Sequence, residues 1–259
     1  MSERTNNLLE LRNIYAGYSG SIRKMNHVLQ DLSLSIKNNE CVGLIGESGS
    51  GKTTLANIIT GFLQPISGQI LFQDNSIEKL ALKKRAKQLS YNIQMVFQDP
   101  YSSFNPRKTI GYQLMEPLVI QKRFAEEEIE AKAYESLEQV GLAPDYFLRY
   151  PHQLSGGQLQ RAALGCSLIM TPRLLIADEP VSSLDVSVQA QVLDLIQDLR
   201  EKLEFSCLFI SHDLAVIYHL CDTVAVLDQG SIVEYGPVEK VFENPQNDYT
   251  KQLIFSMGY

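Results

Sequence analysis

The sequence has no tryptophan, only four cysteines and no long run of apolar residues. The cysteines lie far apart and form no CxxC pair (Cys41, Cys166, Cys207 and Cys221), so we expect reduced core residues rather than zinc or iron–sulfur ligands. No apolar run reaches the roughly 18 residues that a membrane-spanning helix requires. The N-terminus, MSERTNNLLE, also lacks the apolar segment of a secretory signal. These absences favour a cytoplasmic protein with no membrane span of its own.

Positive charge is also scarce. The 23 lysines and arginines are outnumbered by 30 aspartates and glutamates, which gives a formal net charge of −7. A protein of this charge is a poor match for a nucleic-acid backbone, so we expect no nucleic-acid partner. The local basic stretch LKKRAK, at 82–87, is interpreted as a solvated helix face.

Strand patterns dominate the first part of the chain. Two alternating segments, 8–18 and 27–37, predict half-buried strands, and the apolar run 40–46 predicts a strand buried on both faces. A helical pattern over 53–63 and a strand pattern over 66–74 follow.

The later chain has a different organisation. A helical pattern over 126–142, ending at Gly141, and another after Ser155 predict a helical subdomain at about 99–171. From 172 onward, apolar strands alternate with helices, which predicts a parallel sheet flanked by helices. We therefore predict one α/β domain over 1–259, in which 1–98 and 172–259 form a nucleotide-binding core with an N-terminal antiparallel β subdomain.

The segment GESGSGKT matches the phosphate-binding pattern G-x-x-x-x-G-K-[ST], between a predicted buried strand and a predicted helix. Its glycines allow the backbone amides to wrap around phosphates. Lys52 supplies positive charge to the β- and γ-phosphates, and the Thr53 hydroxyl is an oxygen ligand suited to Mg²⁺. The residues expected to hold the nucleotide are Gly46, Glu47, Ser48, Gly49, Ser50, Gly51, Lys52, Thr53 and Thr54.

An acidic pair ends the predicted strand LLIADE, at 174–179. Asp178 can hold Mg²⁺, directly or through a water molecule. Glu179 can reach a water molecule and act as a general base. Combined with the phosphate-binding loop, the pair predicts a site for Mg²⁺-dependent hydrolysis.

A second glycine pair lies in QLSGGQLQR, at 153–161. Ser155, Gly156 and Gly157 carry almost no side chain and precede a helical pattern. Free amides and the helix dipole both favour negative charge at such a helix start. The residues alone predict amides facing an anion.

Taken in order, GESGSGKT, MVFQDP, LSGGQ, LLIADEP, SSLD and ISHD resemble the motifs of the ATP-binding cassette family over nearly the whole chain. The resemblance implies a P-loop, RecA-like core and an active ATPase that uses ATP and Mg²⁺. It also implies that two cassettes pack head to tail. The LSGGQ residues of one cassette (Ser155, Gly156, Gly157 and Gln158) would then bind the γ-phosphate of ATP held by the other, so that ATP joins the subunits and hydrolysis separates them.

The resemblance implies roles for four further positions. Gln98 is similar to the glutamine that touches Mg²⁺ and the attacking water, and His212 to the histidine that contacts the γ-phosphate and positions the general base. Asp185 is similar to the aspartate that couples the two sites. Tyr18 aligns with the aromatic residue that stacks on adenine, with Tyr15 as the alternative.

Three segments, 98–110, 178–192 and 244–254, resemble the ATPase subunits of peptide/nickel importers. This resemblance implies a second ATPase subunit, identical or paralogous, two transmembrane permease subunits and, indirectly, an extracytoplasmic solute-binding protein. The segment after Gln98 would contact the permeases, which places the chain at the cytoplasmic face of the membrane. The sequence stops soon after YTKQLI, where longer members carry an extension with cluster-binding cysteines, so no iron–sulfur cluster is expected. A peptide is favoured over a nickel or other metal chelate.

Two other classes remain as alternatives. One is a cassette ATPase that acts in DNA repair, chromosome structure or translation, and the other is a regulatory module that does not turn over. Repair and chromosome proteins place long coiled coils between the two glycine motifs, whereas only 103 positions separate Lys52 from Ser155. Translation proteins carry two cassettes and basic segments, and a module without turnover has no need of Glu179 and His212.

Overall fold

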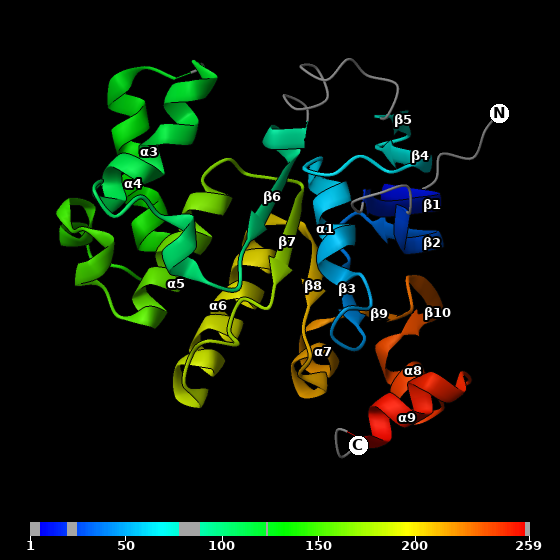
Figure 1. Cartoon of the computed structure of the whole chain (residues 1–259). Coiled ribbons are helices and arrows are strands. Elements are labelled where there is room, and N and C mark those ends of the chain that lie inside the picture. Colours follow the sequence, from blue (N-terminus) through cyan, green and yellow to red (C-terminus); the bar gives the residue numbers. More distant parts are fainter. Residues whose placement is uncertain (1–5, 20–24, 78–88, 123, 257–259) are drawn as a thin grey trace.

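The computed structural model describes residues 6–19, 25–77, 89–122 and 124–256. The basic stretch at 82–87 lies outside these residues. The described chain is built around a six-stranded sheet with the order β10-β9-β3-β8-β7-β6 (Figure 1). Its strands are β3 (Cys41–Ile45), β6 (Ile93–Val96), β7 (Leu174–Asp178), β8 (Ser206–Ile210), β9 (Thr223–Asp228) and β10 (Ser231–Pro237). The first five run parallel, and β10 pairs antiparallel with β9.

The central strands of this sheet are buried on both faces. β3 reads CVGLI and β8 reads SCLFI, and every residue of both strands is buried. Continuous apolar runs of this kind are typical of parallel strands covered on both sides. The predicted parallel sheet and the buried strand within 40–46 are therefore confirmed.

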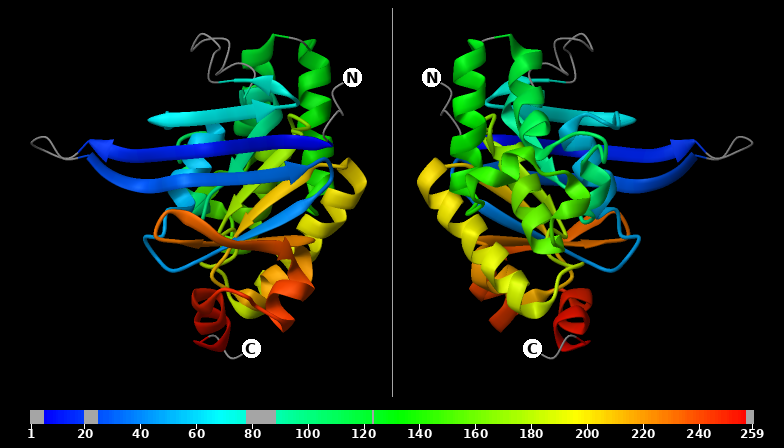
Figure 2. Two further views of the ribbon diagram at one scale, coloured as in Figure 1. Left: turned by 90° about the vertical axis from the view of Figure 1, so that its right-hand side faces the viewer. Right: turned by 90° about the vertical axis from the view of Figure 1, so that its left-hand side faces the viewer.

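A second sheet is antiparallel and has the order β2-β1-β4-β5. Its strands are β1 (Asn7–Ser19), β2 (Met25–Lys37), β4 (Ser67–Phe72) and β5 (Asn75–Ser76). The two long strands extend side by side across the molecule (Figure 2). Irregular register in this pair coincides with left-handed backbone at Asn13 and Asp31, whose side chains are hydrogen-bonded to each other.

The helices lie against the parallel sheet or beside it (Figure 1). They are α1 (Lys52–Thr60), α3 (Ile110–Gln121), α4 (Glu126–Gln139), α5 (Gly156–Leu168), α6 (Val186–Leu203), α7 (Leu214–Leu220), α8 (Val238–Glu243) and α9 (Asp248–Ser256). Short 3₁₀ turns lie at Pro100–Ser103, Pro144–Leu148 and Pro151–Gln153. None of the described helices combines the length and apolar composition needed to cross a bilayer.

Two apolar cores lie on opposite faces of the parallel sheet. On one face, α1 packs between the two sheets, where Leu9, Ile58 and Leu208 belong to one buried cluster. On the other face, a larger cluster joins the sheet to the remaining helices, for example through Phe209 and Leu159. The two cores together hold β3 and the following helix α1 in place.

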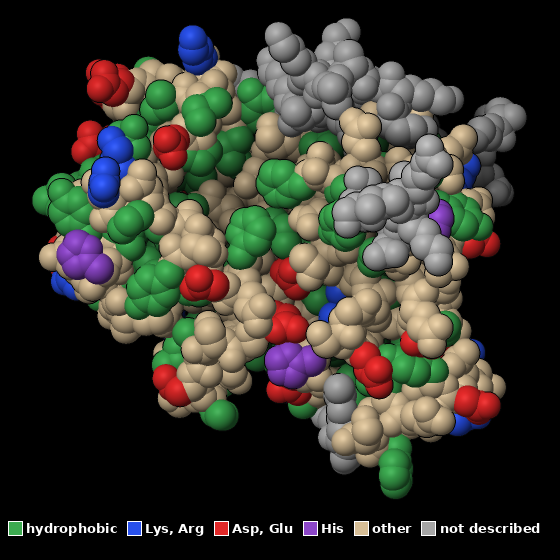
Figure 3. All heavy atoms as spheres, in the orientation of Figure 1, with side chains coloured by type: hydrophobic (Ala, Val, Ile, Leu, Met, Phe, Trp, Pro, Cys, Tyr) green, Lys and Arg blue, Asp and Glu red, His purple; other side chains and the backbone are tan. Residues whose placement is uncertain are grey.

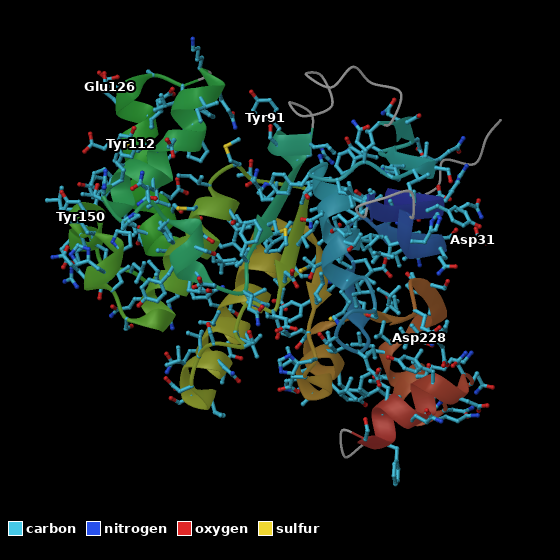
Figure 4. The ribbon with its side chains drawn as sticks, viewed as in Figure 1. Asp31, Tyr91, Tyr112, Glu126, Tyr150 and Asp228 are labelled. Atoms are coloured by element: carbon cyan, nitrogen blue, oxygen red, sulfur yellow. The ribbon has the colours of Figure 1, made fainter. Side chains whose placement is uncertain are left out.

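The helices α3, α4 and α5 lie together at one side of the parallel sheet, with Tyr112, Glu126 and Tyr150 projecting from this region (Figures 1 and 4). The helix predicted over 126–142 is present as α4, and the chain leaves it at Gly141, whose φ of 69° suits glycine. That 99–171 forms a separate subdomain stays a prediction.

Three of the four cysteines meet in the core. Cys41 and Cys207 are partners in neighbouring strands, and the Sγ atoms of Cys41 and Cys221 are 3.6 Å apart. All four cysteines are free thiols, as predicted, although their separation in sequence gave no sign that three would be neighbours.

Candidate nucleotide-binding site

A pocket of about 570 Å³ opens at the carboxyl ends of the parallel strands, where α/β folds bind ligands. The loop after β3 supplies its floor, the end of β7 and the next residue supply an acidic pair, and the second residue after β8 is a histidine. The lining residues are Val28, Gly46, Ser48, Gly49, Gly51, Lys52, Thr53, Thr54, Gln98, Asp178, Glu179 and His212. Figure 3 shows acidic side chains and a histidine gathered near the middle of this face. Seven of the nine residues predicted at 46–54 thus line the pocket, all except Glu47 and Ser50, together with Gln98.

The P-loop, residues 46–53, connects β3 to the start of α1 and requires glycine at two positions. A Cβ at Gly46, whose φ is 152°, would collide with the Leu227 carbonyl oxygen, and one at Gly51, whose φ is 115°, would press on the Leu29 side chain. Glycine is therefore required at both positions. Gly51 is the N-cap of α1, and no side chain caps this helix start. The uncapped amides and the helix dipole suit a phosphate group.

Lys52 lies over this loop. Its Nζ donates hydrogen bonds to the carbonyl oxygens of Gly46, at 2.7 Å, and Glu47, at 2.8 Å. Burial lowers the pKa of Lys52, and the carboxylates of Glu179 and Asp178 oppose that shift. The ammonium group is thus held at the loop and is drawn toward negative charge in the pocket.

Asp178 ends β7 and faces the P-loop. The hydroxyl of Thr53 favours the ionised form of its carboxylate. Burial, and then the neighbouring Glu179, raise the pKa of Asp178, while Lys52 and Thr53 oppose the shift. A divalent cation between Asp178 and Thr53 would relieve this penalty on the ionised carboxylate, so the donor set fits Mg²⁺.

Glu179 is held by backbone and side-chain contacts. Its backbone lies in the left-handed region, with φ of 47°, and its N–H donates to the Ile210 carbonyl oxygen at 2.9 Å. Gln98 Nε2 donates to Oε2 at 2.9 Å, and His212 Nδ1 lies 3.4 Å from Oε1. Gln98 and His212, which are distant from Glu179 in sequence, therefore meet at its carboxylate.

The helix α5, which carries most of the LSGGQ motif in its first turn, begins after Ser155, as predicted. Ser155 Oγ accepts from the Gln158 amide at 3.4 Å, and Gln158 Oε1 accepts from the Ser155 amide at 3.0 Å. This capping box occupies the amides of Ser155 and Gln158, so fewer amides are free at this helix start than we expected. The amides of Gly156 and Gly157 take no part in the box. A Cβ at Gly157 would overlap with Cγ1 of Val188.

Asp185 caps the next helix, α6. Its Oδ1 accepts from the Val188 amide at 3.1 Å and from Ser187 Oγ at 2.7 Å. The hydrogen bond from Ser187, followed by that from the Val188 amide, lowers the pKa of Asp185. Asp185 and residues 155–158 do not line the pocket around Lys52 in the described structure.

Of the two candidate aromatic residues, Tyr18 is the one in contact with α1. Its hydroxyl lies 3.3 Å from Thr54 Oγ1, and 49% of the residue is exposed. Tyr15 instead pairs with Ser67 of β4. Neither residue lines the pocket, so the choice between them as the adenine contact stays a prediction.

Sequence reasoning missed two residues near this site. Val28 of β2 lines the pocket, and no local pattern distinguishes it from the other residues of its strand. Tyr249 of α9 accepts a hydrogen bond from the Glu47 amide at 3.0 Å. Tyr249 lies in the terminal segment 244–254 that we had singled out, but only for its resemblance to importer ATPases.

An apolar hollow of about 470 Å³ lies beside β6. Its larger apolar side chains include Phe62, Leu89, Met95 and Phe97, the last of which directly precedes Gln98. Phe62 is 74% exposed and Phe97 is 39% exposed. Figure 3 shows hydrophobic side chains exposed over the middle of this face.

The chain is similar to known proteins over most of its length. The model of the ABC transporter family matches residues 29–182. The di/tripeptide transport ATP-binding protein DppF of Pseudomonas aeruginosa is 43% identical over 243 residues, covering 94% of this chain and 73% of the relative. The oligopeptide transport ATP-binding protein AppF of Bacillus subtilis is 42% identical over 256 residues, covering 96% and 78%.

Solved structures give the same result. The dimeric post-hydrolysis structure of the ATP-binding cassette MJ0796 bound to ADP and phosphate has a TM-score of 0.80 at 27% identity, covering 89% of this chain and 98% of that one. CbiO1 of Clostridium perfringens, part of an ABC transporter complex, has a TM-score of 0.82 at 27% identity, covering 93% and 92%.

The chain belongs to the ABC transporter family. It is an ATPase of that family, with the P-loop fold and with ATP and Mg²⁺ as its cofactors. Two features of the P-loop fit a bound nucleotide independently of these comparisons. The start of α1 is uncapped, and within the described structure the Ser50 hydroxyl is buried without a hydrogen-bond partner.

Proposed function

We propose that this chain is the ATPase subunit that energises a peptide importer. The observation that carries the proposal is the convergence of Lys52, Asp178 and Glu179 on one pocket, in a chain whose relatives are named for di/tripeptide and oligopeptide transport. A complete set of hydrolytic side chains supports turnover rather than regulation alone. The named relatives support transport rather than DNA repair or translation.

The residues divide the chemistry among themselves. The P-loop amides and Lys52 would hold the phosphates, and Thr53, Asp178 and Gln98 would hold Mg²⁺, which would neutralise charge on the phosphates. Glu179 orients the attacking water and takes up its proton. His212 would contact the γ-phosphate and keep Glu179 in position, and Tyr18, rather than Tyr15, would stack on adenine.

A second ATPase subunit completes the site. The phosphate-facing residues of this chain line one pocket, whereas Ser155, Gly156, Gly157, Gln158 and Asp185 lie outside it. We infer that these residues act on the nucleotide held by a partner cassette, identical or paralogous. The dimeric form of the solved cassette MJ0796 supports this inference.

Two transmembrane permease subunits are the proposed membrane partners, and a solute-binding protein acts through them. The apolar hollow with exposed Phe62 and Phe97, together with Tyr101 at 53% exposure, suits a short amphipathic helix of a permease. Gln98 follows Phe97 directly and is hydrogen-bonded to Glu179. A permease helix that docks at this surface would therefore change the position of the general base. The chain would then lie at the cytoplasmic face of the membrane.

Transport by a deletion strain tests the proposal. The gene is deleted in its source organism, and uptake of a radiolabelled dipeptide, a radiolabelled pentapeptide and radiolabelled nickel is measured. We expect peptide uptake to be lost, and to be restored by the wild-type gene and by Glu138→Gln, a control on the exposed side of α4, but not by Glu179→Gln.

The nickel measurement distinguishes the substrate alternative. Loss of nickel uptake with normal peptide uptake would make the chain part of a metal importer. Unchanged uptake of all three compounds would contradict an import function for these substrates.

A further inference from the structure

The C-terminal helix α9 contacts the P-loop directly. The Glu47 amide donates to Tyr249 Oη at 3.0 Å, and the Glu47 carbonyl oxygen accepts from Lys52 Nζ at 2.8 Å. Glu47 is the second residue of the P-loop and is itself exposed. The backbone of this one residue is therefore held on one side by α9 and on the other by the lysine expected to bind phosphate.

Tyr249 is delivered to the P-loop by a well-anchored segment. The carboxylate of Glu234, on β10, accepts from the amides of Gln246, at 2.8 Å, and Asn247, at 3.0 Å. Asn247 Oδ1 then accepts from the Tyr249 amide at 2.8 Å. Burial by itself would raise the pKa of Glu234, but the amides of Gln246 and Asn247 bring it below its usual value, so the anchor is ionised at neutral pH.

The helix itself is packed against the core. Thr250 is fully buried, and Leu253 and Ile254 are 4% and 5% exposed. Asp228, at the end of β9, lies near the C-terminal helices (Figure 4). Burial raises the pKa of Tyr249, as do the charges of Glu47 and Asp228, so the phenol keeps its proton at neutral pH. The Tyr249 hydroxyl is therefore presented to the P-loop by a helix that is packed against the core.

We propose that Tyr249 is a positioning residue for nucleotide binding, which pre-organises the P-loop through the Glu47 backbone. When phosphate binds, the three N–H donors of the Lys52 ammonium group are shared between the phosphate and the carbonyl oxygens of Gly46 and Glu47, which weakens its hold on the loop. The hydrogen bond from the Glu47 amide to Tyr249 then remains to hold the start of the loop. The segment 244–256 is thereby coupled to ATP binding, and the coupling must be reciprocal.

The inference rests on the proposed assignment of the P-loop as the phosphate site, and the first measurement is ATP affinity. Binding of ATP with Mg²⁺ to the full chain is compared for the wild type, Tyr249→Phe and Tyr235→Phe. Tyr235 is the matched control, since its hydroxyl also makes a hydrogen bond to the backbone, as donor to the Ser35 carbonyl oxygen at 3.2 Å, and it does not line the nucleotide pocket. We expect Tyr249→Phe to weaken ATP binding about 3- to 10-fold, the range of one lost hydrogen bond, and Tyr235→Phe to leave it unchanged.

Two further readouts separate positioning from general stability. Tyr249→Phe should raise the KM for ATP while kcat at saturating ATP stays within about twofold and the melting temperature changes little, because the ring and its packing remain. Hydrogen exchange of the Glu47 amide should become faster in the variant. Asn247→Ala, which releases the start of α9 but keeps the phenol, should shift ATP affinity in the same direction.

The two possible failures are distinguishable. If Lys52→Ala binds ATP as well as the wild type does, the P-loop assignment is wrong. If Lys52→Ala loses binding while Tyr249→Phe and Asn247→Ala bind like the wild type, the positioning role of Tyr249 is refuted and the P-loop assignment stands.

Discussion

Replacement of Glu179 by glutamine tests the proposed general base with little structural disturbance. Glutamine has the shape of glutamate, and its amide oxygen can still accept the hydrogen bond that Gln98 Nε2 gives to Glu179 Oε2 at 2.9 Å. The side chain is 21% exposed, so no deeply buried group is left without a partner. The substitution therefore removes a proton acceptor and a charge and leaves the packing intact.

The expected magnitude follows from those two losses. A positioned general base contributes about 10²- to 10⁴-fold to a rate, so the barrier to hydrolysis should rise by about 3–5 kcal/mol. The His212 Nδ1 atom, 3.4 Å from Glu179 Oε1, loses its charged partner. The pKa of Asp178 should fall, because Glu179 is one of the groups that raise it.

The assay combines phosphate release with light scattering. Since hydrolysis is expected to separate the two cassettes, Glu179→Gln with Mg²⁺ and ATP should accumulate as a dimer, while Glu138→Gln should behave like the wild type. A turnover rate of Glu179→Gln within about threefold of the wild type would refute the assignment of the base. A slow variant whose melting temperature has also fallen sharply would trace the loss to folding instead.

Two further predictions concern the stability of the nucleotide-free chain. Because the native pKa of Asp178 is raised, its ionisation is disfavoured in the folded state, and its contribution to stability falls as pH rises from the unfolded value of about 3.9 through the native pKa. Asp178→Asn should therefore raise the melting temperature at pH 7–8 and flatten its pH dependence above about pH 4, while abolishing Mg²⁺-dependent hydrolysis; a lower melting temperature at pH 7–8 would contradict the sign. Gly157→Ala should lower stability by about 1–3 kcal/mol in urea unfolding, because the new methyl group overlaps with Val188, and Val188→Ala in the same chain should restore part of the loss. Strictly additive effects of the two substitutions would mean that the overlap is not the cause.

The sequence by itself determined the local parts of this protein. A strand that is apolar throughout, a glycine loop and a helix are contiguous, so β3, the P-loop and α1 could be predicted from 40–63 alone. The acidic pair at 178–179 could also be predicted, because it is contiguous with the apolar residues of β7. The predicted start of α5 after Ser155 likewise depends only on neighbouring residues.

The residues that surround Glu179 were only partly accessible from the sequence. Gln98 and His212 were assigned through a family resemblance, and nothing in their spacing places them at one carboxylate. Their meeting depends on the strand order β6-β7-β8, which brings the ends of three strands to one edge of the sheet. Hydrophobic periodicity reveals which face of a strand is buried and not which strand lies beside it.

Only the tertiary structure decided the most distant contacts. Tyr249 and Glu47 are 202 positions apart, and Cys41 and Cys221 are 180 positions apart. Val28 reaches the pocket from β2 because α1 packs between the two sheets. Contacts of this kind arise from how layers pack on one another, and no property of the separate segments specifies that packing.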